Sequence, residues 1–328
     1  MRRILGLIVL GLLSAAPALA AETPSPALLV LNKEDNALAI VDPATRTVVA
    51  SIPVGEAPHE VTASADGKLA FVSNYGSRQP GHTISVIDLV AQKEIHRVDL
   101  SPMGRPHGLT YADGKVYFTA EASKLIGRYD PAANQVDWLL GTGQNTTHMV
   151  LLSKDRNMIF ISNIGSDSIT IIERAANRLD WNETVVAVGK GPEGFDVSPD
   201  GRELWAAHSR DGGVSIIDVA AKKVVQTLTL GTRRSNRLKF TPDGKYVFVS
   251  DMGGNELLIL EAATRQVVKR LKPGSSPEGI LMVPDGSRAY VAVANDNQVA
   301  VVDLKTLEVT DHIATGRGPD GMAWAERH

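Results

Sequence analysis

Short stretches in which apolar and polar residues alternate follow one another along the chain from Ala27, each bounded by turn-forming residues. Several of these stretches end at Asp, as in Ile84-Ser-Val-Ile-Asp88 and Val214-Ser-Ile-Ile-Asp218. Alternation over five residues predicts a β-strand, and the Asp favours a turn because its side chain can bond the nearby backbone. We therefore expect an all-β protein with no helix or linker between its strands.

A longer pattern repeats along the chain: the end of one strand, a Gly-Pro loop, a short strand, an Asp-Gly turn and another strand. Residues 188–207 contain it, as do residues 54–73, 101–120, 143–162, 230–250 and 272–292, with a truncated copy at 314–325. A period in the forties with four short strands per repeat predicts the blades of a β-propeller. We interpret the Asp-Gly pairs at 66–67, 113–114, 200–201, 243–244 and 285–286 as two-residue hairpin turns.

The number of blades follows from counting two kinds of segment. Sets of three strands start at residues 28, 69, 115, 158, 203, 246 and 289, and there are also seven inner strands. The last inner strand, residues 321–324, has no set after it, and the set at residue 28 has no inner strand before it. We therefore predict a seven-bladed propeller with four antiparallel strands per blade, in which the C-terminal strand completes the N-terminal blade. Closure of this kind removes two exposed sheet edges.

The N-terminus has the pattern of a secretory signal peptide. Arg2 and Arg3 precede an apolar run over residues 4–13, and Ala18-Leu19-Ala20 has the small residues of a cleavage site. The apolar run is too short to span a bilayer, and no later stretch is long enough. We expect residues 1–20 to be removed and residues 21–328 to form a single, monomeric domain in the periplasm or outside the cell.

Composition excludes several classes of function. The chain has no cysteine, which rules out disulfides, thiolate metal sites and covalently bound c-type haem. A net charge of −3 and 5% aromatic residues argue against nucleic acid as a partner. The four tryptophans have no period of the kind that pyrroloquinoline-quinone propellers need. We expect a small-molecule ligand or a periplasmic protein partner.

The repeats resemble the YVTN-repeat (YncE-like) family of seven-bladed propellers over essentially the whole mature chain. Phe71-Val-Ser-Asn74, Phe160-Ile-Ser-Asn163 and Phe248-Val-Ser-Asp251 carry this resemblance, together with Ser198-Pro-Asp-Gly201 and Thr241-Pro-Asp-Gly244. The resemblance implies the fold but no single function, because the family includes scaffolds, partners of redox enzymes, and nucleic-acid or cell-wall binders. Residues 107–128 also resemble the repeat of the metal-dependent streptogramin lyases.

The first residue of each inner strand is polar in all seven repeats. In ring order these residues are His59, His107, His148, Glu193, Asn236, Glu278 and Asp320. Polar residues at such positions often cap loop ends by bonding the backbone, and that interpretation remains open for each one. Three imidazoles on consecutive blades also suit Zn, Cu or Fe. We predict a transition-metal site at the mouth of the central channel, with His59, His107, His148 and Glu193 as ligands.

Further residues at the same mouth suggest roles beside the metal. His208 ends a strand where other repeats have Asn or Asp, and we consider it, with Glu278 and Asp320, as a proton-transfer group; a solvent-facing loop histidine is the alternative. Arginines lie in or beside the loops of that face and could bind an anionic ligand together with Asn236. These arginines are Arg105, Arg233, Arg234, Arg237 and Arg317.

Two classes of function agree with these features. The first is a metal-dependent enzyme of the lactonase, lyase or oxidase type, in which the metal polarises a carbonyl or activates water and the arginines hold an anionic end. The second is a non-catalytic module that binds a protein, a cell-wall component or a nucleic acid at the same mouth. The feature common to both is the binding of a small, anionic ligand in an exported propeller.

Overall fold

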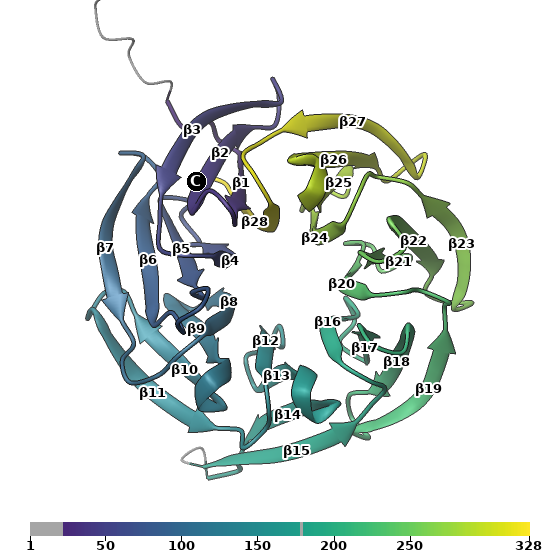
Figure 1. Ribbon diagram of the computed structural model, residues 1–328. Helices are drawn as coiled ribbons and strands as arrows, with labels where there is room; N and C mark the ends of the chain where they lie inside the picture. Colours follow the sequence, from purple (N-terminus) through teal and green to yellow (C-terminus); the bar gives the residue numbers. More distant parts are fainter. Residues whose placement is uncertain (1–21, 178–179) are drawn as a thin grey trace, which may run out of the picture.

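The computed structural model describes residues 22–177 and 180–328 and forms a closed ring of seven four-stranded antiparallel sheets (Figure 1). The inner strands of the blades surround a central channel, and the fourth strands form the perimeter. The fold and the number of blades are as predicted. Besides strands, the described residues contain three single turns of 3-10 helix, Glu121–Ser123, Ile164–Ser166 and Ala294–Asp296. None of the helices in these two ranges is long and apolar enough to cross a membrane.

The strands of each blade are given in order from the channel outward. Blade one contains β28 (Pro319–Ala325), β1 (Ala27–Asn32), β2 (Ala37–Asp42) and β3 (Thr47–Pro53). Blade two contains β4 (Pro58–Ala63), β5 (Leu69–Asn74), β6 (Thr83–Asp88) and β7 (Lys93–Asp99). Blade three contains β8 (Pro106–Ala112), β9 (Lys115–Ala120), β10 (Leu125–Asp130) and β11 (Gln135–Gly141). Blade four contains β12 (Thr147–Leu152), β13 (Met158–Asn163), β14 (Ser168–Arg174) and β15 (Trp181–Ala187).

The remaining three blades have the same arrangement. Blade five contains β16 (Pro192–Val197), β17 (Glu203–His208), β18 (Gly213–Asp218) and β19 (Lys223–Thr229). Blade six contains β20 (Ser235–Phe240), β21 (Tyr246–Asp251), β22 (Glu256–Glu261) and β23 (Gln266–Leu271). Blade seven contains β24 (Pro277–Met282), β25 (Arg288–Val293), β26 (Gln298–Asp303) and β27 (Glu308–Ala314).

The ring closes through the pairing of β28 with β1, as the sequence predicts. Leu28 lies opposite Trp324, Leu29 opposite Ala323 and Val30 opposite Met322, all in antiparallel register. The last strand of the chain thus occupies the inner position of a blade whose other three strands come first. Both edges that an open arrangement would expose are paired or face the channel.

The core consists of apolar clusters between neighbouring blades, because each sheet buries both of its faces. Every residue of β1 is buried, so the second strands read as continuous apolar runs rather than alternating ones. Large side chains recur at the third residue of the second strand and are almost fully buried: Phe71, Phe160, Trp205, Phe248 and Tyr290. Truncating one of them to Ala would cost about 3–5 kcal/mol.

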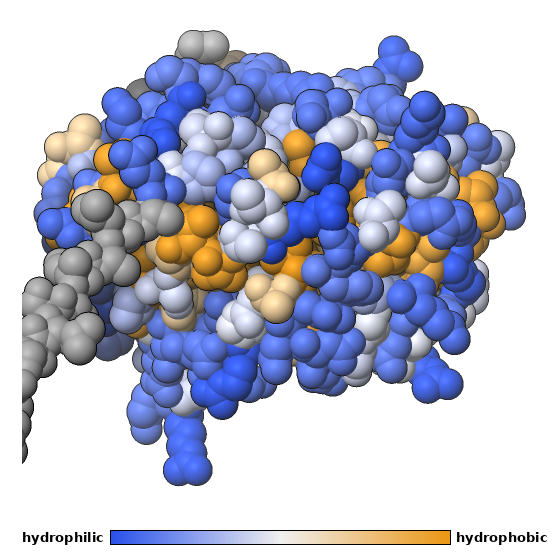
Figure 2. Space-filling view, turned by 90° about the horizontal axis from the view of Figure 1, so that it is seen from above, coloured by the Kyte–Doolittle hydropathy of each residue, from blue (hydrophilic) through white to orange (hydrophobic). Residues whose placement is uncertain are grey.

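The outer surface is mainly hydrophilic, with apolar residues appearing in a band between the two polar ends of the ring (Figure 2). Single exposed apolar side chains on six of the outer strands contribute to it: Val48, Ile95, Leu139, Val185, Val225 and Val268. One apolar residue per outer strand is ordinary for a soluble sheet edge.

Four of the five Asp-Gly turns are longer than predicted. Only Asp113 and Gly114 form a two-residue hairpin, both with positive φ. In the other four the loop has five residues, as between β4 and β5, and only the Gly has positive φ. In that loop Ser64 donates a hydrogen bond to Asp66 at 2.6 Å, and the Asp66 carboxylate accepts one from the Lys68 amide. These side-chain hydrogen bonds stabilise the five-residue loop. The Asp-Gly dipeptide alone does not show whether such a loop or a two-residue turn forms.

Candidate functional site in the central channel

A β-bulge near the start of each inner strand directs side chains into the channel. In β4 the pairing passes from Pro58 opposite Asn74 to Val61 opposite Val72, so His59 and Glu60 together face the single residue Ser73. The same irregularity occurs in all seven inner strands. A bulge of this kind re-aims side chains and is common beside functional sites. It breaks the simple alternation on which the sequence argument relied.

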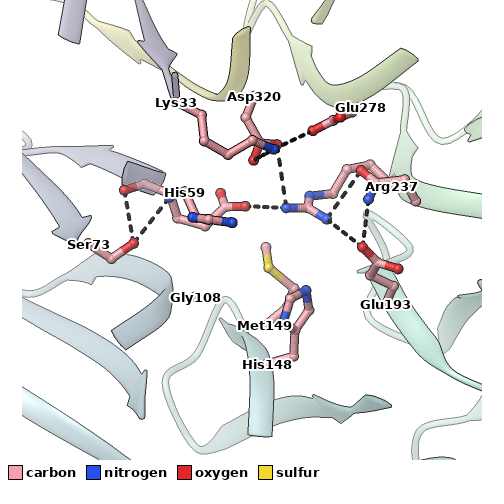
Figure 3. Close-up of polar contacts among 12 residues, drawn as sticks. Lys33, His59, Ser73, Gly108, His148, Met149, Glu193, Arg237, Glu278 and Asp320 are labelled. Atoms are coloured by element: carbon pink, nitrogen blue, oxygen red, sulfur yellow. Dashed lines mark hydrogen bonds and ion pairs between the residues drawn. The ribbon is translucent and has the colours of Figure 1, made fainter. Parts of the chain in front are cut away.

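Small hydroxyl side chains hold these bulges in place. Ser73 accepts a hydrogen bond from the Glu60 amide at 3.1 Å (Figure 3). Ser250 accepts one from the Arg237 amide at 2.9 Å and donates to the carbonyl of Glu278 on the next blade at 2.8 Å. The equivalent Ser162 also donates to a carbonyl of the next blade, that of Glu193 at 2.9 Å, so these hydroxyl groups hold neighbouring inner strands together.

Two tiers of side chains line the channel at this end. The first tier is the ring expected from the sequence. His59 and Glu193 are half-buried, and the other five members are at most 6% exposed: His107, His148, Asn236, Glu278 and Asp320. The second tier comes from the residues that directly follow the second strands. It includes Lys33, Tyr75, Glu121, Ile164 and Met252, which line the same cavity as the first tier.

His107, His148 and Glu121 converge in this cavity. One ligand atom from each lies within 4.8 Å of the others, and all three side chains are buried. The rings of His107 and His148 have centroids 3.7 Å apart. Nδ1 of His107 and Nε2 of His148 are buried without any hydrogen-bond partner. Two unsatisfied imidazole nitrogens in one buried cavity are unusual, and they suit a bound metal ion.

Glu121 connects this pair to Tyr75. The carboxylate lies 2.5 Å from Nδ1 of His148 through one oxygen, and its other oxygen accepts a hydrogen bond from the Tyr75 hydroxyl at 2.6 Å. Burial alone would raise the pKa of Glu121, but the hydrogen bonds from His148 and Tyr75 lower it. Burial and the bond to Glu121 raise the pKa of Tyr75 to about 12. Glu121 is therefore an anion held between two donors.

His59 lies beside this group but makes a different contact. Its Nδ1 bonds the carbonyl of Ala57 at 2.8 Å, and its ring centroid is 4.5 Å from Tyr75 and 5.0 Å from His107. Burial lowers the pKa values of both His59 and His107, that of His107 strongly, so both rings are neutral at pH 7. Neutral imidazole is the form that binds metals.

The opposite side of the cavity is a network of charged groups. Lys33 contacts Glu278 at 3.0 Å and Asp320 at 3.1 Å. Burial and the charge of Asp320 raise the pKa of Glu278 to about 7. Burial would also raise the pKa of Asp320, but Lys33 and Arg237 outweigh this effect and lower it to about 2. Asp320 therefore holds the negative charge, and Glu278 exchanges a proton near neutral pH.

An ion pair crosses the channel beside this network (Figure 3). Arg237 of blade six donates to Glu60 of blade two at 2.5 Å and lies within 4.0 Å of both Glu193 and Asp320. Burial alone would lower the pKa of Arg237, but the surrounding carboxylates raise it. Five other blades have Gly or Met at the equivalent position, so this crossing contact occurs once. The charge of Arg237 is thus balanced by carboxylates of the protein itself.

The structure places the predicted site residues in different parts of the channel and its mouth. His107 and His148 meet as predicted, whereas Glu193 lies with the ion pairs, accepting a hydrogen bond from Asn236 at 2.6 Å. Glu278 and Asp320 line the cavity together. Among the arginines, Arg234 lines the cavity, Arg233 is exposed beside it, and Arg105 lies over the ring of Tyr75 at 4.7 Å.

His208 lies outside the cavity lining. Its Nδ1 contacts Asp211 at 2.9 Å, and its Nε2 accepts a hydrogen bond from the Gly189 amide at 3.3 Å. The equivalent Asn74 and Asp251 also accept hydrogen bonds from loop amides, those of Gly55 and Arg233. The contacts of His208 are therefore those of a residue that holds the loop between blades.

The sequence pattern did not predict three residues of the site, Glu121, Glu60 and Lys33. Glu121 and Lys33 each come directly after a second strand, in register with one another, so a comparison of that position across the repeats would have shown them. Glu60 and Arg237 are the charged exceptions at a position occupied by Gly in four blades. The sequence feature that could have identified them is a charged residue in place of glycine, directly after a residue predicted to face the channel.

Comparison with known proteins assigns the family. The profile of the YNCE-like beta-propeller family matches residues 4–185 and, in a second alignment, residues 115–288. The chain belongs to the YNCE-like β-propeller family. Seven-bladed beta-propeller protein Rv1057 of Mycobacterium tuberculosis is 26% identical over 259 residues, 67% of this chain and 63% of that protein. Antigen Lp49 of Leptospira interrogans is 24% identical over 214 residues, 58% of this chain and 44% of that protein.

The matches therefore span about half to two-thirds of the length of these relatives. Among solved structures, the periplasmic gluconolactonase PpgL of Pseudomonas aeruginosa superposes on this YNCE-like propeller with a TM-score of 0.74. Its sequence is 17% identical, and the superposition covers 92% of this chain and 99% of that chain. At this identity the likeness concerns the fold alone.

Proposed function

We propose that this protein binds one divalent transition-metal ion in its central channel, between His107, His148 and Glu121, and that it opens a cyclic ester of a small polar ligand there. The observation that carries the metal proposal is the pair of buried, unpartnered nitrogens on His107 and His148, with Glu121 beside them. Two imidazoles and one carboxylate are a donor set that suits Zn or Fe and leaves positions open for water and ligand.

The neutrality of the His107 ring supports this assignment. Burial and neighbouring positive charges keep the pKa of His107 far below neutral pH, so the ring offers a lone pair without first losing a proton. The anionic Glu121 offsets part of the positive charge of a metal ion. Two buried nitrogens without a partner cost free energy, and a bound ion would remove that cost.

The chemistry proposed is the hydrolysis of a lactone, for which the neighbouring gluconolactonase fold is the support. A bound metal supplies Lewis acidity and lowers the pKa of water. One water is consumed: its oxygen bonds to the carbonyl carbon, the ring C–O bond breaks, and the leaving oxygen takes a proton. Glu278 lines the cavity with a pKa of about 7 and is suited to carry that proton.

Metal analysis of residues 21–328 tests the proposal. Chelated protein is reloaded separately with Zn, Co, Cu and Fe, dialysed, and its metal content measured together with hydrolysis of glucono-1,5-lactone. We expect about one retained ion per chain, a loss of it in H107A, H148A and E121Q, and full retention in H96A, whose ring lies on the outer strand β7. H59A and E193Q tell whether these residues also contribute, as the sequence predicts.

Two outcomes oppose parts of the proposal. If the wild type retains no metal after loading with any of the four ions, or if H107A and H148A retain as much as the wild type, there is no such site. If metal is retained but no lactone is turned over, the protein is a metal-dependent binding module, which is the non-catalytic alternative of the sequence analysis.

We also propose that the protein is exported. The support is the charged, apolar and small-residue pattern of residues 1–20, which lie outside the described residues. Sequencing the N-terminus of protein from a periplasmic fraction should give a first residue near Ala21. Recovery of uncleaved protein from the cytoplasm would contradict export.

A further inference from the structure

The charged residues around the cavity in which we propose a metal ion do not favour an anionic ligand. Five carboxylates surround it or its crossing ion pair: Glu60, Glu121, Glu193, Glu278 and Asp320. Three basic groups oppose them: Lys33, Arg234 and Arg237. Above pH 7, where Glu278 is ionised, the excess of two negative charges equals the charge of one divalent ion. A loaded site would therefore have no surplus positive charge for a carboxylate or phosphate.

Two of the three basic groups are also engaged by the protein. Lys33 contacts two carboxylates at 3.0 and 3.1 Å, and Arg237 lies against three. An anionic ligand would have to displace these contacts, at the expense of leaving a buried carboxylate unpaired. The third basic group, Arg234, is exposed and has no ion pair with any residue in the ranges 22–177 and 180–328.

Acceptors without donors remain on the acidic side of the cavity. Oδ1 of Asp320 is buried and has no hydrogen-bond partner, and the residue is 2% exposed. Glu193 uses Oε1 to accept from Asn236 at 2.6 Å, and no hydrogen bond within the described part of the chain reaches its second oxygen. A ligand that satisfies these oxygens must donate hydrogen bonds to them, as hydroxyl groups do.

The size of the cavity limits the ligand. Its volume is about 200 Å³, below the roughly 300–1,000 Å³ of most small-molecule pockets. The Glu60–Arg237 pair crosses the channel, and Arg237 also lines this cavity. A ligand of several hydroxyl groups on a short carbon skeleton fits these limits.

We infer that the cavity takes an uncharged, hydroxyl-rich ligand of sugar size, whose hydroxyl groups donate to Asp320 and Glu193, and that it discriminates against the phosphorylated form of the same ligand. This inference rests on the proposed function for the metal ion opposite these residues. It replaces the anionic ligand expected from the arginines with a sugar or sugar lactone without an ionised group. Discrimination arises because carboxylate oxygens without a hydrogen-bond donor attract hydroxyl groups and repel anions.

The experiment compares ligands that share one carbon skeleton. Metal-loaded protein (residues 21–328) is titrated calorimetrically with sorbitol, sorbitol 6-phosphate and gluconate, and metal content is measured on the same samples. We expect sorbitol to bind at least tenfold more tightly than either anion. We expect D320N and E193Q each to weaken sorbitol binding about tenfold, and H96A, on the outer strand β7, to leave it unchanged. Melting curves check that each variant is folded, and the two substitutions report independently of one another.

The outcomes separate this inference from the proposed function. Tighter binding of sorbitol 6-phosphate, lost in R234Q, would overturn the inference and restore an anion site. Absence of sorbitol binding to protein that retains its metal would overturn the inference alone. Sorbitol binding to a protein that retains no metal would overturn the metal proposal and leave the acidic wall as the recognition element.

Discussion

Glu121 accepts a hydrogen bond from the Tyr75 hydroxyl with one oxygen and contacts Nδ1 of His148 with the other. Tyr75 therefore helps to orient the imidazole, although it does not contact Nε2, the nitrogen proposed to bind the metal. Such an arrangement fixes which ring nitrogen is protonated and where the other one points. Tyr75 is therefore a positioning residue. It comes from the loop after β5, whereas His148 begins β12, two blades further along the ring.

Replacing Tyr75 by Phe removes one hydrogen bond to Glu121 and leaves the ring in place. We expect metal affinity to fall about tenfold, because loss of an outer-shell partner typically costs that much or more. Competition with a chelator measures the affinity, and the nitrogen chemical shifts of His148 report its tautomer. Tyr111→Phe is the matched control, since that ring stacks on Phe71 away from the cavity. Unchanged affinity and shifts in Tyr75→Phe would show that Glu121 needs no second donor.

Glu278 makes stability depend on pH. Its pKa is about 7 in the folded protein and near 4.5 in an unfolded chain, so between these values the folded state binds more protons. Stability contributed by the protonated form is complete below pH 4.5 and is lost as pH rises through 7. The variant E278Q has no ionisable group at this position, so its stability does not decrease in this way as pH rises. We expect the two proteins to be similar at pH 5 and the variant to be more stable at pH 8 by on the order of 2 kcal/mol.

Denaturant unfolding at pH 5, 6, 7 and 8 gives both stability curves, and taking their difference removes the contribution of all other titrating groups. Parallel curves for wild type and E278Q would mean that Glu278 stays ionised throughout this range. The result does not depend on a metal, because Glu278 contacts Lys33 and Ser276 rather than the histidines.

At the scale of the strand, glycine after the first-tier residue lets neighbouring inner strands approach closely. A Cβ on Gly279 would lie 2.2 Å from the carbonyl oxygen of Asp320, and one on Gly194 would lie 2.5 Å from the Cα of Arg237. These are contacts with backbone, which cannot move aside without opening the ring. The same glycines place Asp320 and Arg237 where their side chains meet in the channel.

The substitution Gly279→Ala is therefore expected to lower stability by roughly 2–3 kcal/mol, as overpacking does in a well-packed interior. Gly141→Ala is the matched control, because a Cβ there meets no atom within 4 Å and its φ is not in the left-handed region. Thermal unfolding of both variants measures the difference. Equal melting temperatures would show that the inner strands tolerate greater separation.

At the scale of the whole molecule, stability depends on joining the two ends of the chain. β28 pairs with β1 and also packs against β24 and β4 of the adjacent blades. Since each blade buries its faces against two neighbours, losing one inner strand exposes apolar surface on both sides.

Removal of residues 319–328 is expected to leave β1 with an unpaired edge and to cause aggregation or a large fall in melting temperature. Removal of residues 326–328 alone keeps the pairing intact and serves as the control. Light scattering and thermal unfolding distinguish the two proteins. A truncated protein that remains monomeric with an unchanged melting temperature would show that ring closure contributes little.

The repeat spacing alone determined the seven blades and the pairing of the C-terminal strand with residues 28–31, because strands of period two bounded by turns have few other ways to bury both faces. It also placed His107 and His148 on one ring. Only the tertiary structure decided what meets them: Glu121 belongs to a different segment, and the bulges turn Glu60 and Arg237 inward against the parity of the strand. Contacts across the channel join residues far apart in the sequence, such as Glu60 and Arg237, which are separated by 177 positions, and no local pattern contains that distance. For the same reason Arg237, one of the arginines that suggested an anion site, could not be recognised as already paired until the carboxylates opposite it were located in space.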